Sequence, residues 1–296
     1  MYKIEYLKDH KSHQVKLINS SQKSHAAISL NQGASLNELT IKGKPIIKDL
    51  FPLKYEDTYA SSILFPFANR IKDGIYTFNE KQYQIKTNHK EENNALHGFV
   101  YNKVFKIVSK KITEWEASIT LEYEEFERSR GFPYTYKIQL TYILSENRLH
   151  LDVCVKNTDF KDFPFTIGWH PYFLSKDLYS SKVKFNCNKK VVLGNRMITT
   201  GIEEYPANEI LQIENKQLDD CFILNSNKIE FLTPEYNLEI SSTSKNNFLQ
   251  LYTPSKRNTI AIEPTTGISD SFNNKIGLDI LESDMSYFIK WTILLN

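Results

Sequence analysis

The sequence predicts an all-β protein, a large antiparallel β-sandwich, and three observations support this class. Apolar and polar residues alternate in short runs along most of the 296-residue chain. Helical periodicity is nearly absent, and polar turns separate the alternating runs. Many short strands joined by such turns are typical of antiparallel sandwiches.

The clearest strands lie between residues 134 and 155. Every second residue from Tyr134 to Tyr142 is apolar, and a second alternating run covers residues 149–155. The polar segment 145–148 between them predicts a turn, so the two runs should form an antiparallel hairpin. Similar runs predict strands at residues 75–78, 83–85, 104–112, 119–123, 183–185, 221–224, 229–232, 238–241, 248–252, 259–262 and 287–295.

Composition favours one domain that spans residues 1–296. Hydrophobic residues make up 41% of the chain, with 18 Phe and 17 Tyr, which is enough for a substantial core. A chain of this length buries roughly three quarters of its extended surface. No repeat, low-complexity tract or Gly/Ser linker marks a boundary between domains.

Charge and cysteine usage exclude several classes of function. The 37 Lys and Arg nearly balance the 35 Asp and Glu, and no block of one sign indicates nucleic-acid binding. Neither a secretory signal nor a membrane-spanning stretch is evident, so we expect a cytoplasmic protein without membrane association. Cys154, Cys187 and Cys221 are scattered, which argues against disulfides or zinc. The mixed-charge run 86–92 is interpreted as a solvated loop.

The stretch FTIGWHPYF, residues 165–173, has the pattern of a strand with two different faces. Phe165, Ile167 and Trp169 would share the core face. Thr166, Gly168 and His170 would share the other face, where the glycine leaves room for a ligand. His170 is therefore a candidate site residue, although a histidine here could also be a structural, hydrogen-bonded residue.

The stretch NTIAIEPTTG, residues 258–267, repeats this arrangement around one carboxylate. Pro264 cannot donate to a sheet ladder, so we expect it to end the strand and to leave Glu263 at the strand terminus. Strand ends commonly open into clefts. The alternative is a surface carboxylate in an ion pair.

Three shorter segments carry further candidates. Asn69 and Arg70 follow an apolar run, and His97 lies in a loop; each could be an ordinary surface residue. Asp219 and Asp220 precede a strand, where the pleat sends them to opposite faces. Asp220 shares the more apolar face, so Asp219 is the better candidate for a cleft.

Together and in this order, the five stretches resemble the aldose 1-epimerase (galactose mutarotase) family. The resemblance covers roughly residues 60–290. It rests on Asn69-Arg70, Leu96-His97-Gly98, His170-Pro171-Tyr172-Phe173, Asp219 and Glu263-Pro264-Thr265-Thr266-Gly267. It implies the galactose mutarotase-like supersandwich, with the sugar bound on the concave face.

The resemblance also implies a reaction and a role for each residue. The protein would interconvert the α and β anomers of a free hexose such as galactose or glucose, without cofactor or metal, with Glu263 as base and His170 as acid. The sugar-binding residues would be Asn69, Arg70, His97 and Asp219. We expect a small-molecule sugar as partner and a monomer or homodimer.

Three alternatives stay open at this point. A carbohydrate-binding module could keep the cleft without turnover. His97, His170 and Glu263 could form a metal site, although they lack metal-ligand spacing. The substrate could also be a hexose 6-phosphate, which would need further basic residues beside the cleft. The candidates for that role are Arg128, Arg130, Arg196 and Arg257.

Overall fold

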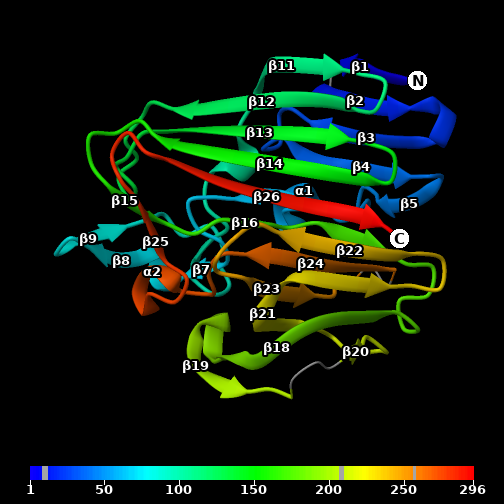
Figure 1. Ribbon diagram of the computed structural model, residues 1–296. Helices are drawn as coiled ribbons and strands as arrows, with labels where there is room; N and C mark the ends of the chain where they lie inside the picture. Colours follow the sequence, from blue (N-terminus) through cyan, green and yellow to red (C-terminus); the bar gives the residue numbers. More distant parts are fainter. Residues whose placement is uncertain (9–12, 207–209, 256–257) are drawn as a thin grey trace.

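The computed structural model describes residues 1–8, 13–206, 210–255 and 258–296, and it confirms the all-β prediction. Arg257, one of the candidate phosphate ligands, lies outside the described residues. The α-helices of the described part are single turns, α1 (Tyr55–Thr58) and α2 (Ser271–Asn274). Almost all other regular structure is antiparallel strand (Figure 1).

A small sheet forms from the N-terminal fifth of the chain, which the sequence reading did not assign to strands. Its order follows the sequence, and every pair is antiparallel. The strands are β1 (Tyr2–Lys8), β2 (His13–Asn19), β3 (Ser24–Ser29), β4 (Ser35–Ile41) and β5 (Lys44–Ile47).

A much larger sheet contains fifteen strands of the described residues. Its main path is β11 (Lys106–Ile112), β12 (Ala117–Glu125), β13 (Tyr136–Leu144), β14 (Arg148–Asn157), β26 (Ser286–Leu295), β22 (Asn237–Ser242), β21 (Asp219–Leu232), β23 (Phe248–Tyr252), β24 (Thr259–Thr265), β16 (Gly168–Trp169) and β6 (Ile63–Leu64). Off this path lie β17 (Tyr172–Leu174), β18 (Lys182–Leu193), β19 (Thr199–Glu204) and β20 (Ile210–Gln212).

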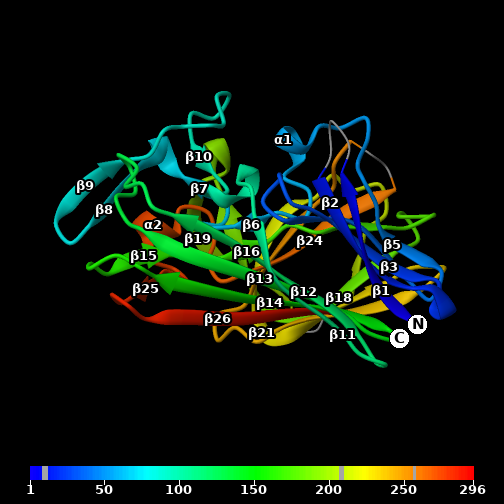
Figure 2. The same ribbon diagram turned by 90° about the horizontal axis from the view of Figure 1, so that it is seen from above.

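Short two-stranded ladders complete the structure on one side of the large sheet. They pair β7 (Arg70–Ile71) with β10 (Ala95–Leu96), β8 (Ile75–Phe78) with β9 (Lys81–Gln84), and β15 (Phe163–Phe165) with β25 (Asp279–Leu281). Figure 2 shows β26 and β21 along one edge of the molecule, with β7, β10 and α1 on the opposite side.

The two sheets share one hydrophobic core, because alternate residues of each strand point inward. The predicted hairpin is confirmed as β13 and β14, in which Tyr142 pairs with Leu151. Leu17 and Leu39 of the small sheet belong to the same buried cluster as Tyr142 of the large one. Trp169 of β16 and Trp291 of β26 belong to the same cluster. Their rings are stacked, with centroids 6.1 Å apart.

The prediction of one strand over residues 165–173 is wrong. The segment forms three short pieces, β15, β16 and β17, because its backbone bonds to other segments between them. The amide of Thr166 donates to the carbonyl of Pro66, and the amide of His170 donates to the carbonyl of Ser62. Thr166 is fully buried and its hydroxyl accepts the amide of Ala68. It therefore does not share an open face with His170.

The prediction that Glu263 ends its strand is also wrong. β24 continues through Pro264, which pairs with Leu249 of β23. The amides of Ile262 and Thr266 donate to the segment that leads from Ile167 to Pro171, so the nitrogen of Pro264 faces the same side. Pro264 falls between the two short pairings on this edge, Gly168 with Thr265 and Tyr172 with Ala261, so its missing N–H interrupts neither.

Two predicted strands, residues 221–224 and 229–232, belong to the single strand β21. The polar residues between them predicted a turn, but they stay extended. They carry the strand from its pairing with β23, at Asp219–Ile223, to its pairing with β22, at Lys228–Leu232. Both neighbours therefore lie along one edge of β21, while β18 occupies the other edge.

Two further findings concern the class of protein. No helix in the described ranges is long and apolar enough to cross a membrane. Cys154, Cys187 and Cys221 are all free thiols. The cytoplasmic location and the single-domain organisation stay predictions.

The hydroxyl of Tyr142 links the two sheets and gives the first testable prediction. It donates to the carbonyl of Ala34, at 2.8 Å, from a fully buried position. Tyr142→Phe should lower the free energy of unfolding by about 1–3 kcal/mol, because it leaves a buried carbonyl unpaired. Urea unfolding measures this loss.

Tyr136 on the same strand is the matched control. It is equally buried, but its hydroxyl has no hydrogen-bond partner among the described residues. Tyr136→Phe should therefore leave stability within about 0.5 kcal/mol or raise it. Equal losses in the two variants would contradict the role of the Tyr142 hydrogen bond.

Candidate active site

All six residues singled out in the sequence line one cavity of about 430 Å³. We call it the site cavity. Arg70 begins β7, His97 follows β10, and His170 lies between β16 and β17. Asp219 begins β21, and Glu263 lies within β24. The cavity is lined by Glu56, Asp57, Thr58, Tyr59, Asn69, Arg70, Asn88, His89, Lys90, Glu91, Leu96, His97, His170, Tyr172, Asp219, Gln250, Tyr252 and Glu263.

His170 and Glu263 form a buried imidazole–carboxylate pair in this cavity. Nε2 of His170 lies 3.4 Å from Oε1 of Glu263, and the two residues are only 5% and 3% exposed. The His170 ring stacks on Tyr172, with centroids 5.0 Å apart, and meets the ring of His97 edge-on at 5.2 Å. These contacts fix the plane of the imidazole against the carboxylate.

Burial shifts both pKa values of the pair towards the uncharged forms. Desolvation raises the pKa of Glu263 well above its ordinary range, helped by the charge of Asp219 and opposed by that of Arg70. Desolvation lowers the pKa of His170 to about 3. The two groups are in contact and titrate as a unit, which should hold one proton between them at neutral pH.

A chain of side-chain hydrogen bonds runs across the floor of the cavity. Nε2 of Gln250 donates to Asp219 at 2.7 Å, and Nδ2 of Asn69 donates to Gln250 at 3.3 Å. Nη1 of Arg70 donates to Asn69 at 3.1 Å. Sequence reasoning missed Gln250, but a signal exists: it is the one amide in the otherwise apolar or aromatic run 248–252.

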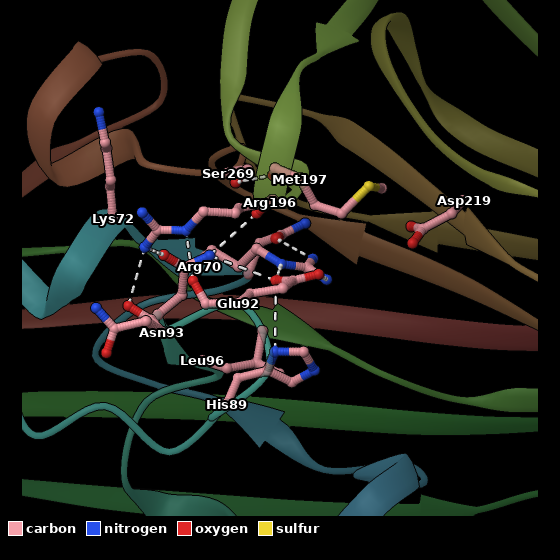
Figure 3. A network of polar contacts seen from close by, with 12 residues as sticks. Arg70, Lys72, His89, Glu92, Asn93, Leu96, Arg196, Met197, Asp219 and Ser269 are labelled. Atoms are coloured by element: carbon pink, nitrogen blue, oxygen red, sulfur yellow. Dashed lines mark hydrogen bonds and ion pairs between the residues drawn. The ribbon is translucent and has the colours of Figure 1, made fainter.

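Glu92 is a second residue that the sequence reading missed. Its carboxylate accepts from Nε of Arg70 at 2.5 Å and from Nη2 at 3.0 Å, a bidentate pair (Figure 3). The interpretation of residues 86–92 as a solvated loop holds only in part: Lys86, Asn88, Lys90 and Glu91 are exposed. Residues 88–91 also line the cavity, and the carboxylate of Glu92 holds an arginine of the site. Hydropathy cannot separate such a loop from a solvated one.

The turns that carry Asn69 and His97 are joined through their backbones. The amide of His97 donates to the carbonyl of Asn69, and the amide of Phe99 donates to the carbonyl of Phe65. Asn69 and His97 both adopt left-handed backbone conformations, with φ of 59° and 60°. Gly98 is required here, because a Cβ at φ 71° would lie 2.1 Å from the carbonyl oxygen of Phe65.

Of the two adjacent acids, Asp219 faces the site cavity and Asp220 does not. The carboxylate of Asp220 pairs with Lys190, at 2.6 Å, on the other face of β21. Burial raises the pKa of Asp219 to about 6, although the positive charge of Arg70 opposes the rise. Asp219 is thus ionised at neutral pH at a cost to stability.

The three candidate phosphate ligands within the described ranges, Arg128, Arg130 and Arg196, do not line the site cavity. Arg128 pairs with Asp159 at 2.9 Å, and Arg196 pairs with Asp73 at 2.7 Å. Arg130 is likewise absent from the lining. Among the described residues, the lining carries two full cations, Arg70 and Lys90, against the carboxyl groups of Glu56, Asp57, Glu91, Asp219 and Glu263.

The proposed metal site finds no support in the geometry. His97, His170 and Glu263 are all described, yet no group of three or more such side chains in the described ranges is arranged to hold a metal ion. Instead, the two imidazoles meet edge to face.

Fold and cavity together define an all-β sandwich protein with a polar cavity that holds a buried imidazole–carboxylate pair. The sequence model of the aldose 1-epimerase family matches residues 13–293. The chain belongs to the aldose 1-epimerase family.

Two kinds of relatives agree with this assignment. Uncharacterized protein YihR of Escherichia coli K12 is 27% identical over 271 residues, which cover 88% of this chain and 86% of that protein. The crystal structure of a galactose mutarotase-like protein from Clostridium acetobutylicum has a TM-score of 0.89 at 20% identity. The structural match covers 100% of this chain and 98% of the Clostridium chain. Galactose 1-epimerase from Lactobacillus acidophilus NCFM has a TM-score of 0.83 at 16% identity, with coverage of 100% and 98%. At such identities the structural likeness shows the fold.

The raised pKa of Asp219 predicts how stability depends on pH. A folded-state pKa near 6, against about 3.9 in an unfolded chain, means that stability is lost as pH rises through about 6. Asp219→Asn stays neutral and can still accept from Gln250. It should therefore raise the free energy of unfolding at pH 7 by roughly 1–3 kcal/mol, at about 1.4 kcal/mol per pKa unit.

Denaturant unfolding of both proteins between pH 4 and pH 7 checks this expectation. The gain should shrink towards zero as pH falls to 4, where the wild-type carboxyl is protonated. Asp220→Asn is the control. It should give no such gain, because the substitution removes the ion pair with Lys190. A stability difference that does not vary with pH would contradict the burial of an ionised Asp219.

Proposed function

We propose that the protein is an aldose 1-epimerase, an isomerase that interconverts the α and β anomers of a free hexose such as galactose or glucose. The observation that carries this proposal is the buried pair of His170 and Glu263, 3.4 Å apart in a cavity of about 430 Å³. Membership of the aldose 1-epimerase family supports it. The reaction needs no redox step and no cofactor.

Anomer exchange needs one base and one acid. Glu263 takes the proton of the C1 hydroxyl, and His170 gives a proton to the ring oxygen, so that the C1–O5 bond breaks and a C1 aldehyde forms. Rotation about the C1–C2 bond presents the other face of the aldehyde. The same two groups then act in reverse to close the ring.

This proton transfer explains why both groups are buried. Before ring opening the pair is Glu263 carboxylate with His170 imidazolium, and after it the pair is neutral. A low-dielectric cavity favours the neutral pair, so burial lowers the energy of the ring-opened state relative to the closed one. A C1 hydroxyl that donates to Glu263, together with the charge of Arg70, favours the carboxylate while the ring is closed.

The other cavity residues hold the hydroxyl groups of the sugar. Asp219 accepts, Arg70 donates, and Asn69 and Gln250 can do both. Desolvation lowers the pKa of His97 well below its ordinary value, helped by His170 and Arg70. Its neutral imidazole can then donate or accept without adding charge near the reacting atoms.

A free sugar fits this cavity better than a phosphorylated one. The negative lining would repel a phosphate group, and none of the candidate arginines within the described ranges, Arg128, Arg130 and Arg196, lines the cavity. A carbohydrate-binding module is also disfavoured, because a binder gains nothing from desolvating an acid–base pair, which costs stability.

Polarimetry on freshly dissolved sugars tests the proposal. Wild-type protein should accelerate mutarotation of a free hexose and should act at least about tenfold less efficiently, in kcat/KM, on the same hexose 6-phosphate. Glu263→Gln should lower kcat by roughly 10²–10⁴-fold, the usual worth of a positioned proton transfer. His170→Asn should do the same.

Wild-type turnover by Glu263→Gln would exclude the mechanism. Binding of a free sugar without any acceleration by the wild type would favour the binding module instead. Faster turnover of the phosphate ester would favour the hexose 6-phosphate alternative.

A further inference from the structure

Arg196 has no role in the chemistry above, yet it makes an unusually complete set of contacts beside the site cavity. It lies in a 3₁₀ turn, Asn195–Met197, between β18 and β19. Nε donates to the carbonyl of Glu92 at 2.5 Å. Nη2 lies 2.7 Å from the Asp73 carboxylate, 3.0 Å from the carbonyl of Asn93 and 2.8 Å from Oδ1 of Asn94.

The turn that carries Arg196 is itself fixed. The hydroxyl of Ser269 donates to the carbonyl of Met197, and the hydroxyl of Thr199 donates to the carbonyl of Ser269, each at 2.7 Å. Nδ2 of Asn94 donates back to the carbonyl of Arg196 at 3.0 Å. Arg196 therefore anchors residues 92–94 to the turn between β18 and β19 (Figure 3).

The anchored loop presents Glu92 to Arg70. Their side chains are only 19% and 13% exposed, and Glu92 occupies both Nε and Nη2 of the guanidinium. Burial alone would raise the pKa of Glu92, but the contact with Arg70 lowers it below the ordinary range. Glu92 is therefore a carboxylate at neutral pH, and the pair is a charge-assisted bidentate contact.

Several carboxylates compete for the Arg70 guanidinium, so its contact with Glu92 decides where the guanidinium lies. Arg70 also acts electrostatically on Asp219 and Glu263 inside the cavity, so an unrestrained guanidinium would be drawn to them. The contact with Glu92 holds it at the wall, while Nη1 reaches Asn69. One N–H on each terminal nitrogen makes no hydrogen bond to the described residues, so both can bind a sugar oxygen.

We propose that Glu92 is a positioning residue that fixes the Arg70 guanidinium for sugar binding, and that Arg196 locks the loop that carries Glu92. This inference rests on the proposed function for its kinetic consequence. Its structural part, the immobilised Arg70, is independent of turnover.

Two variants break the lock at different points. Glu92→Gln removes the charge next to Arg70, and Arg196→Met removes the guanidinium that donates to residues 92–94. Each should raise KM for the preferred free hexose by about tenfold or more while kcat changes less than about threefold, because the acid–base pair is untouched. Arg128→Met is the matched control, since Arg128 pairs with Asp159 outside the cavity, and it should leave both constants unchanged.

A spectroscopic measurement separates positioning from a merely structural role. In ¹H–¹⁵N spectra of the full chain, the Nε–H signal of Arg70, assigned by its absence in Arg70→Lys, should be sharp and slowly exchanging in the wild type. It should broaden or disappear in Glu92→Gln and Arg196→Met, and persist in Arg128→Met. If Arg196→Met does not fold, Arg196→Lys replaces it and should show the same change to a smaller degree.

The outcomes are distinct. An unchanged Arg70 signal in both variants overturns the inference, and so does an altered signal with unchanged KM. A wild type without mutarotase activity overturns the proposed function. In that case the Arg70 signal still decides whether Glu92 and Arg196 hold the guanidinium.

Discussion

The burial of one ionisable pair, His170 with Glu263, is the constraint on which the rest of the site depends. An isolated buried charge is costly, so each group is pushed towards its neutral form, and the pair holds a single proton. Such a pair needs uncharged neighbours in direct contact with the imidazole. The aromatic ring of Tyr172 and the neutral imidazole of His97 are those neighbours.

The fold provides this environment by bringing distant segments to one place. Glu263 lies inside a continuous strand, where the ladder with β23 fixes its direction, while His170 lies at a break between two short strands. At this break the amide of His170 donates to the carbonyl of Ser62, while its imidazole lies against Glu263. The large sheet is therefore regular at Glu263 and interrupted at His170.

The sequence predicted the all-β class, most of the central strands and the residues that meet in the cavity, because alternation and short motifs are local signals. It failed where long-range contacts decide. The break within residues 165–173 and the passage of β24 through Pro264 both depend on partner segments distant in the chain. Glu92 looked like a solvated charge because its partner, Arg70, is 22 residues away in sequence. Asp219 was separable from Asp220 because strand parity is local.

The most direct measurement of the central claim is the protonation state of Glu263. Without sugar bound, infrared difference spectra between the wild type and Glu263→Gln at pH 7 should show a protonated-carboxyl band that the variant lacks, and Asp219→Asn should retain it. The account predicts that this band persists well above the ordinary titration range of a glutamate. An ionised Glu263 at pH 7, titrating near its ordinary pKa, would contradict it.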